Sequence, residues 1–117
     1  MNFGDVYKNK TVLVTGHSGF KGSWLSEWLL LLGANVVGYS LVEPPSEPSH
    51  FTALQLGEHL TDDVRDDIRS LDALQAAIQR HKPDFIFHLA AQPLVREGFN
   101  APYYTVETNV MGSLNVL

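Results

Sequence analysis

The sequence predicts an α/β fold in which a parallel, doubly wound β-sheet is covered by helices. An apolar run over residues 12–14 is followed by three glycines at intervals of three and then by an apolar stripe at helical spacing. Segments of strand and helix character then alternate along the rest of the chain. Helices that alternate with strands favour parallel neighbours in the sheet.

The first strand is expected at residues 12–15, because a continuous apolar run suits a strand that is buried on both faces. A helix is expected over 21–33, where large apolar side chains recur at helical spacing and Gly33 supplies the residue that ends it. Trp24 and Trp28 lie one turn apart on that helix. We expect them to pack against the sheet rather than to bind a ligand.

The second strand is expected at residues 36–40. Residues 43–50 hold three prolines and predict a loop near the carboxyl end of that strand, where ligands often bind in open α/β sheets. A short helix is expected at 51–56. A third strand is expected within 59–66, ending near Asp66 or Asp67.

Ser70 is a good N-cap for a helix that ends in the region of Pro83. The fourth strand is expected at residues 84–89, and Pro102 opens the last helix. Right-handed crossovers between these strands predict the order 3-2-1-4.

The composition of the 117 residues suits one small globular domain. The net charge of −5 and the lack of a basic cluster argue against nucleic acid and anionic membranes as partners. The absence of cysteine is compatible with the cytoplasm, where we expect the protein. The longest apolar run, residues 28–32, is too short to span a bilayer. Because the chain stops inside an apolar helical stripe, we expect a truncated domain, the front part of a longer protein.

The glycine pattern predicts a site for a dinucleotide. Gly16 allows a sharp turn after the first strand, Gly19 lets a pyrophosphate approach the backbone, and Gly22 allows close helix packing. The first N–H groups of the following helix then face the phosphates. The alternative is a turn that binds nothing. A Walker A loop is excluded because Lys21 precedes Gly22 instead of following it.

Four motifs resemble the extended short-chain dehydrogenase/reductases, in the order found in that family. They are TGHSGFKG, the Asp67-Ile68 pair, HLAAQ (88–92) and TNVMGSLNVL (108–117). Within the family, GHSGFKGSWLSEWL, EPPSEPSHF and HLAAQPLVRE resemble the nucleotide-sugar 4,6-dehydratases that act on CDP-glucose. The resemblance implies a Rossmann-like fold and NAD as cofactor.

The resemblance also implies a reaction. A hydride passes from sugar carbon 4 to the nicotinamide, water is lost across carbons 5 and 6, and the hydride returns to carbon 6, leaving a 4-keto-6-deoxy sugar. The family's catalytic Tyr-x-x-x-Lys is absent, since neither Tyr103 nor Tyr104 has a lysine four residues on. We read both tyrosines as packing or pocket-wall residues. The catalytic residues and the substrate domain are expected outside residues 1–117, in a full-length protein that is a homo-oligomer.

Two alternatives stay open. One is a non-catalytic NAD(P)-binding regulatory module of the same superfamily, and the other is a different nucleotide-sugar dehydratase or epimerase. A Tyr-x-x-x-Lys in the remaining sequence would separate the enzymes from the regulatory module.

The expected cofactor-binding residues come from the glycine loop, the ends of the strands and the last helix. They are Gly16, His17, Ser18, Gly19, Phe20, Lys21, Gly22, Ser40, Asp67, Ile68, Leu89, Ala90, Ala91, Gln92 and Asn109. The family resemblance implies that Asp67 and Ile68 contact the adenine. It also implies that Asn109 helps to hold the active site together. Arg96 is expected to contact the substrate, and no metal site is expected.

Ser40 stands where an acidic residue would hold the ribose hydroxyls of NAD. A serine lacks that bidentate hold and does not repel a 2′-phosphate, and no arginine stands beside it in the sequence to attract one. The residues therefore leave NADP open as a cofactor, and the resemblance favours NAD.

Several polar residues have a structural alternative. His17 contacts the ligand or only shapes the turn, and Lys21 contacts the ligand or is solvated. In the acidic run 62–67 we expect solvated surface charge, with only its last aspartate kept as an adenine contact, because no metal-loop pattern fits it. His81 and His88 lack metal-ligand spacing and are expected to be unrelated.

Overall fold

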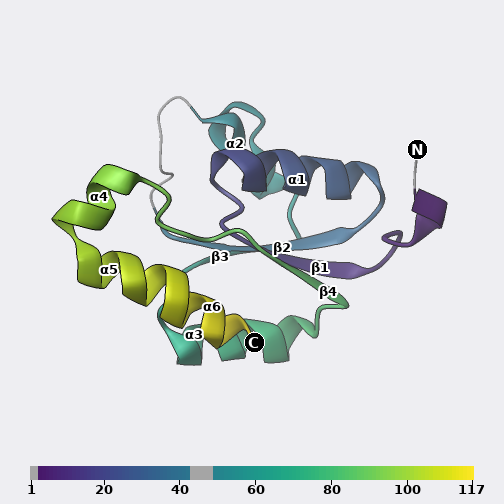
Figure 1. Ribbon diagram of the computed structural model, residues 1–117. Helices are drawn as coiled ribbons and strands as arrows, with labels where there is room; N and C mark the ends of the chain where they lie inside the picture. The colour runs from purple at the N-terminus through teal and green to yellow at the C-terminus, as the bar shows by residue number, and fades with distance from the viewer. Residues whose placement is uncertain (1–2, 43–48) are drawn as a thin grey trace.

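In the computed structural model, which describes residues 3–42 and 49–117, one four-stranded sheet has helices on both faces (Figure 1). The strands are β1 (Thr11–Thr15), β2 (Asn35–Ser40), β3 (Asp62–Arg65) and β4 (Phe85–His88). All neighbours are parallel, and the order is β3-β2-β1-β4. This order confirms the predicted arrangement.

Helix α1 (Phe20–Leu31) and the short α2 (His50–Ala53) lie on one face of the sheet, with a 3₁₀ turn η2 (Leu56–Glu58) after α2. The other face carries α3 (Leu71–His81), α5 (Pro102–Val106) and α6 (Gly112–Val116) (Figure 1). A π-helical segment, η3 (Glu107–Met111), joins α5 to α6. Helix α4 (Val95–Asn100) follows β4, and the 3₁₀ turn η1 (Phe3–Asp5) precedes β1.

The core has one layer on each side of the sheet, because successive side chains of a strand point to opposite faces. Leu13 packs with Tyr39 and Leu74 on the side of α3. Val12 and Val14 pack with the α1 side of the molecule. All three β1 residues are fully buried, as expected for a strand covered on both faces.

The predicted packing of the two tryptophans is wrong. Trp24 and Trp28 are 53% and 51% exposed. The buried residues of α1 are mostly small, namely Gly22, Ser23, Ser26 and Leu29. Small side chains let the helix axis approach the sheet closely, so α1 packs through its small residues and leaves the two tryptophans half exposed. Trp24 stacks on His50, and Trp28 lies against Phe3.

The predicted helix boundaries are mostly confirmed. Gly33 has φ +88° just after α1, and Ser70 caps α3 by accepting a hydrogen bond from the Ala73 N–H. Lys82, in the left-handed region, ends α3 before Pro83, and Pro102 opens α5.

Some elements were not predicted. Helix α4 has no counterpart in the prediction. The last helix, predicted to open at Pro102, is present as α5, η3 and α6, and only the π-helical geometry of η3 was not foreseen. Of the proline-rich segment 43–50, residues 43–48 lie outside the described part. Ser49 precedes α2 as its N-cap, and His50, predicted in the loop, is the first residue of α2. None of the helices in the described residues has the length and apolarity that a membrane crossing needs.

Candidate dinucleotide-binding site

The glycine loop begins where β1 ends. Gly16 has φ +75°, and its N–H donates to the Tyr39 carbonyl at 2.8 Å. A Cβ at Gly16 would lie 2.8 Å from the Ala90 nitrogen and 2.9 Å from the Leu89 carbonyl carbon. The chain leaving β4 therefore crosses directly over the turn, and both the backbone angle and the space require glycine.

Helix α1 starts against this turn. A Cβ at Gly22 would overlap the Gly16 carbonyl oxygen, so the close contact is with the turn itself rather than with the sheet. Gly19 is the N-cap, with φ −78°, and no side chain caps the helix. The N–H groups of Phe20, Lys21 and Gly22 therefore have no helical acceptor, and among the described residues no hydrogen-bond acceptor is recorded for them. This arrangement fits a pyrophosphate at the start of α1.

Ser18 joins the glycine loop to the end of β2. It is buried, and its Oγ lies 2.7 Å from the Oγ of Ser40. Ser40 is the last residue of β2, so the structure puts it at the strand end that the sequence indicated. Its contact with a ribose stays a prediction.

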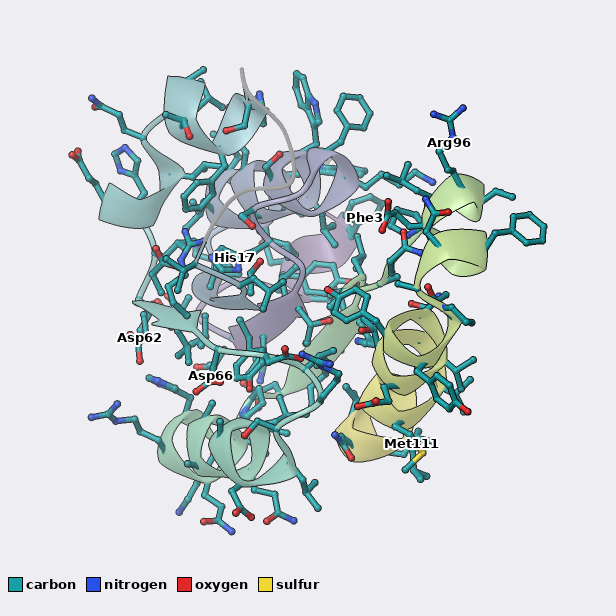
Figure 2. The ribbon with its side chains drawn as sticks, turned by 90° about the vertical axis from the view of Figure 1, so that its left-hand side faces the viewer. Phe3, His17, Asp62, Asp66, Arg96 and Met111 are labelled. Atoms are coloured by element: carbon teal, nitrogen blue, oxygen red, sulfur yellow. The ribbon has the colours of Figure 1, made fainter. Side chains whose placement is uncertain are left out.

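The His17 side chain lies on the side of the sheet that carries α2 (Figure 2). Its ring is fully buried over Gly38, where any Cβ would overlap it, and it meets the Phe51 ring edge-on. Its Nε2 is 2.7 Å from Asp63 Oδ1. Burial lowers the pKa of His17, although Asp63 acts in the opposite direction. These contacts favour the structural alternative for the His17 side chain, and a cofactor contact at His17 stays a prediction.

An arginine does stand beside Ser40 in space, which corrects the expectation from the sequence. Arg65 is the register partner of Ser40 on β3. Its guanidinium bonds both oxygens of Asp63, with Nε–Oδ1 at 2.9 Å and Nη2–Oδ2 at 3.1 Å. Nη1 donates to the Leu41 carbonyl at 2.9 Å, and the group lies 4.8 Å from the centre of the Phe51 ring.

The acidic run is therefore not simply solvated. Asp63 is paired as described, and Asp62 lies 2.7 Å from His81 Nε2. Asp66 is exposed, as expected. Within residues 3–42 and 49–117, no three carboxylate or imidazole groups gather as metal ligands would.

Asp67 and Ile68 follow β3. The carboxylate of Asp67 accepts hydrogen bonds from Arg69 Nε and Nη2, the latter at 2.7 Å, and Arg69 thereby lowers the pKa of Asp67. The Tyr39 hydroxyl donates to the Asp67 carbonyl at 2.8 Å. Ile68 is 5% exposed in the core, where a Cβ at Gly112 would press on it. Adenine binding by this pair stays a prediction.

His88 takes part in a chain of hydrogen bonds from β1 to α6. Thr15 Oγ1 accepts from the Leu89 and Ala90 N–H groups at 3.0 and 3.1 Å, which occupies both of its lone pairs. Its proton must therefore go to His88 Nδ1, 2.7 Å away. His88 Nε2 then carries the ring proton and donates to Ser113 Oγ at 3.0 Å.

This series of hydrogen bonds ends at Asn109 on η3. Ser113 donates to the Asn109 carbonyl at 2.6 Å, so every proton in the series has one direction. Burial lowers the pKa of His88, which agrees with a neutral ring. His88 thus joins β1, β4 and the last helical segment, a role that its spacing from His81 could not reveal.

Asn109 holds the segment after β4. Its Oδ1 accepts from the Gln92 N–H at 2.7 Å, and its Nδ2 donates to the Gln92 carbonyl at 3.0 Å. The side chain of Gln92 reaches on to Thr105 Oγ1 at 2.9 Å and to the backbone of Leu94. Both amides therefore brace this segment, which is compatible with the bracing role that the resemblance implies for Asn109.

The remaining predicted residues are exposed. Phe20, Lys21 and Ala91 lie at the surface. Arg96 points outward from α4 into solvent (Figure 2), and its contact with a substrate stays a prediction.

The tyrosines expected as packing or pocket-wall residues differ from each other. Tyr104 packs under the Arg69 guanidinium, 4.9 Å from its ring centre. Tyr103 is 85% exposed beside a shallow hollow with Pro102 and Val106.

The structure thus brings the glycine loop, Ser40 and the start of the 89–92 segment together at the carboxyl ends of the central strands. Sequence reasoning missed Thr15, Arg65 and Ser113. A polar residue at a strand end was the available signal for the first two, but their partners lie elsewhere in the chain.

A family model described as GDP-mannose 4,6 dehydratase matches residues 13–117. The chain belongs to this family. It is 46% identical over 111 residues to the CDP-glucose 4,6-dehydratase of Salmonella typhimurium, which covers 95% of this chain and 30% of that protein. It is 30% identical over 118 residues to the GDP-mannose 4,6-dehydratase of Vibrio cholerae, covering 92% of this chain and 30% of that protein.

Solved structures agree with the family. The UDP-glucose 4-epimerase of Thermus thermophilus, in complex with NAD, superposes with a TM-score of 0.78 at 28% identity. The match covers 91% of this chain and 32% of the epimerase. The chain therefore spans about a third of the length of the relatives it matches. It corresponds to the dinucleotide-binding part of nucleotide-sugar dehydratases and epimerases.

Proposed function

We propose that this chain is the NAD-binding part of a nucleotide-sugar 4,6-dehydratase that converts CDP-glucose to CDP-4-keto-6-deoxyglucose. The observation that carries the proposal is the 46% identity to a CDP-glucose 4,6-dehydratase, against 30% to a GDP-mannose 4,6-dehydratase over a similar share of the chain. Both relatives are 4,6-dehydratases, so the higher identity to the one named for CDP-glucose supports CDP-glucose as the substrate.

The glycine loop supports a dinucleotide as cofactor. Bound NAD would supply a hydride acceptor that is restored at the end of the reaction. Gly16 and Gly22 leave room for the backbone, and the uncapped start of α1 offers N–H groups to the pyrophosphate. Ser40 would meet the ribose and Asp67 the adenine.

The segment after β4 would lie along the cofactor. Thr15 holds the N–H groups of Leu89 and Ala90, and Asn109 holds both backbone groups of Gln92. These hydrogen bonds fix the wall of the site before any ligand arrives, which lowers the ordering cost of binding. The catalytic Tyr-x-x-x-Lys, the substrate domain and the homo-oligomeric, cytoplasmic state belong to the proposal for the full-length protein.

The test is an assay of the full-length protein with CDP-glucose, GDP-mannose and dTDP-glucose in parallel. The proposal expects the 4-keto-6-deoxy product from CDP-glucose in clear preference to the other two. Preference for another nucleotide sugar would refute the substrate. Tight NAD binding without any product would favour the regulatory module.

The variant Gly19→Val tests the cofactor site. Its side chain would fill the space of the pyrophosphate, so calorimetry is expected to detect no NAD binding while circular dichroism stays unchanged. Unchanged NAD affinity would show that the glycine loop is only a turn.

A further inference from the structure

We propose that the Asp63–Arg65 ion pair sets the preference between NAD and NADP. This inference rests on the proposed function, because it needs a dinucleotide seated on the glycine loop. It concerns the ribose end of that site, where the sequence lacks the usual acidic residue.

The guanidinium of Arg65 lies beside the end of β2, where the proposed function puts the adenine ribose. Ser40 ends β2, and residues at this strand end contact the adenine ribose in dinucleotide folds. Arg65 is the register partner of Ser40, and its Nη1 bonds the carbonyl of Leu41, the next residue along. Ser18 links Ser40 to the glycine loop, so the pyrophosphate and ribose positions are joined.

The Asp63 carboxylate neutralises the charge of the Arg65 guanidinium. Both carboxylate oxygens bond the guanidinium, one face of which lies over the Phe51 ring. Three of its five N–H groups are thus used, one each on Nε, Nη2 and Nη1, and the other two have no recorded acceptor within residues 3–42 and 49–117. The pair has no net charge, so a 2′-phosphate gains little from it. A bare ribose hydroxyl is not penalised.

Changing either member should therefore shift the preference in opposite directions. Without the Asp63 carboxylate, Arg65 is a free cation that would attract a phosphate. Without the Arg65 guanidinium, Asp63 is a free anion that would repel it. The contact of Asp63 with His17 is the complication, because a change at Asp63 also reaches the glycine loop.

The experiment compares calorimetric Kd values for NAD and NADP in the full-length protein. The quantity is the ratio Kd(NADP)/Kd(NAD). In Asp63→Asn, which keeps an acceptor for His17, the ratio is expected to fall at least tenfold. In Arg65→Met, which keeps the apolar stem on Phe51, it is expected to rise at least fivefold. The double variant is expected to return to within threefold of the wild-type ratio.

The Asp67–Arg69 pair is a matched control, with the same spacing and a similar bidentate contact. Asp67→Asn is expected to leave the Kd ratio within threefold of wild type, even where it lowers the affinity for both cofactors. Circular dichroism checks that each variant is folded, and Arg65→Met alone tests the idea if Asp63→Asn does not fold.

The outcomes separate the two proposals. A wild-type protein that binds neither dinucleotide overturns the proposed function and this inference with it. Normal NAD binding with an unchanged ratio in Arg65→Met overturns this inference alone. A shift that persists in the double variant also overturns it, because the effect would then pass through His17.

Discussion

Replacing Thr15 by valine is expected to loosen the junction of β1 with β4 and α6. The change keeps the shape of the side chain and removes its hydroxyl. Thr15 is fully buried, and its Oγ1 bonds the N–H groups of Leu89 and Ala90 and the Nδ1 of His88. Valine therefore tests the hydrogen bonds without opening a cavity.

The magnitude follows from which groups lose their only partner. The Leu89 N–H also donates to the Thr15 carbonyl at 3.1 Å, so it stays paired. The Ala90 N–H and His88 Nδ1 have no other partner among the described residues, so the valine leaves both unpaired. An unpaired buried polar group costs about 1–3 kcal/mol, and both residues are only partly buried, so the sum is about 2–4 kcal/mol.

Hydrogen exchange in the full-length protein measures this cost locally. For amides of residues 11–15 and 85–90, a loss of about 2–4 kcal/mol means exchange faster by roughly 30- to 700-fold, at about 1.4 kcal/mol per factor of ten. Thr15→Ser is the control, since it keeps the hydroxyl and loses one methyl, which costs about 1 kcal/mol. Its exchange is expected to rise only about fivefold.

Histidine nitrogen NMR supplies the second measurement. Wild-type His88 is expected to be neutral with its proton on Nε2, and Thr15→Val is expected to remove this fixed tautomer. Equal exchange in the valine and serine variants, or a wild-type His88 protonated on Nδ1, would refute the proton direction argued from Thr15.

The remaining predictions concern the glycine loop and pH. Gly22→Ala is expected to abolish dinucleotide binding in calorimetry, despite the better helix propensity of alanine, because the new Cβ overlaps the Gly16 carbonyl oxygen. Gly98→Ala, where a Cβ meets open space, should bind normally, and equal binding by both would contradict the packing argument. The thermal midpoint is expected to fall as the pH drops below 6.5. Burial lowers the pKa of His17 and His88, so the unfolded chain takes up protons first, and a midpoint that rises on acidification would contradict this.

Features that depend on neighbours in the chain could be predicted from the sequence. The apolar run predicts the strand at residues 12–15, and the hydroxyl of Ser70 predicts a helix cap. The turn at Gly16 is predicted because glycine tolerates the positive φ that the structure shows there. The strand order follows from the handedness of the crossovers. These rules are local or general, so one sequence is enough to apply them.

Features that depend on distant partners were decided by the tertiary structure. Thr15 and His88 are 73 residues apart, and Ser40 meets Arg65 only through the register of β2 and β3. Trp24 and Trp28 have helical spacing, but the small residues beside them on α1 set which face approaches the sheet. The periodicity of the sequence predicts that an apolar stripe exists on the helix. Its orientation and the pairing of polar groups follow only when sheet register and helix packing are satisfied together.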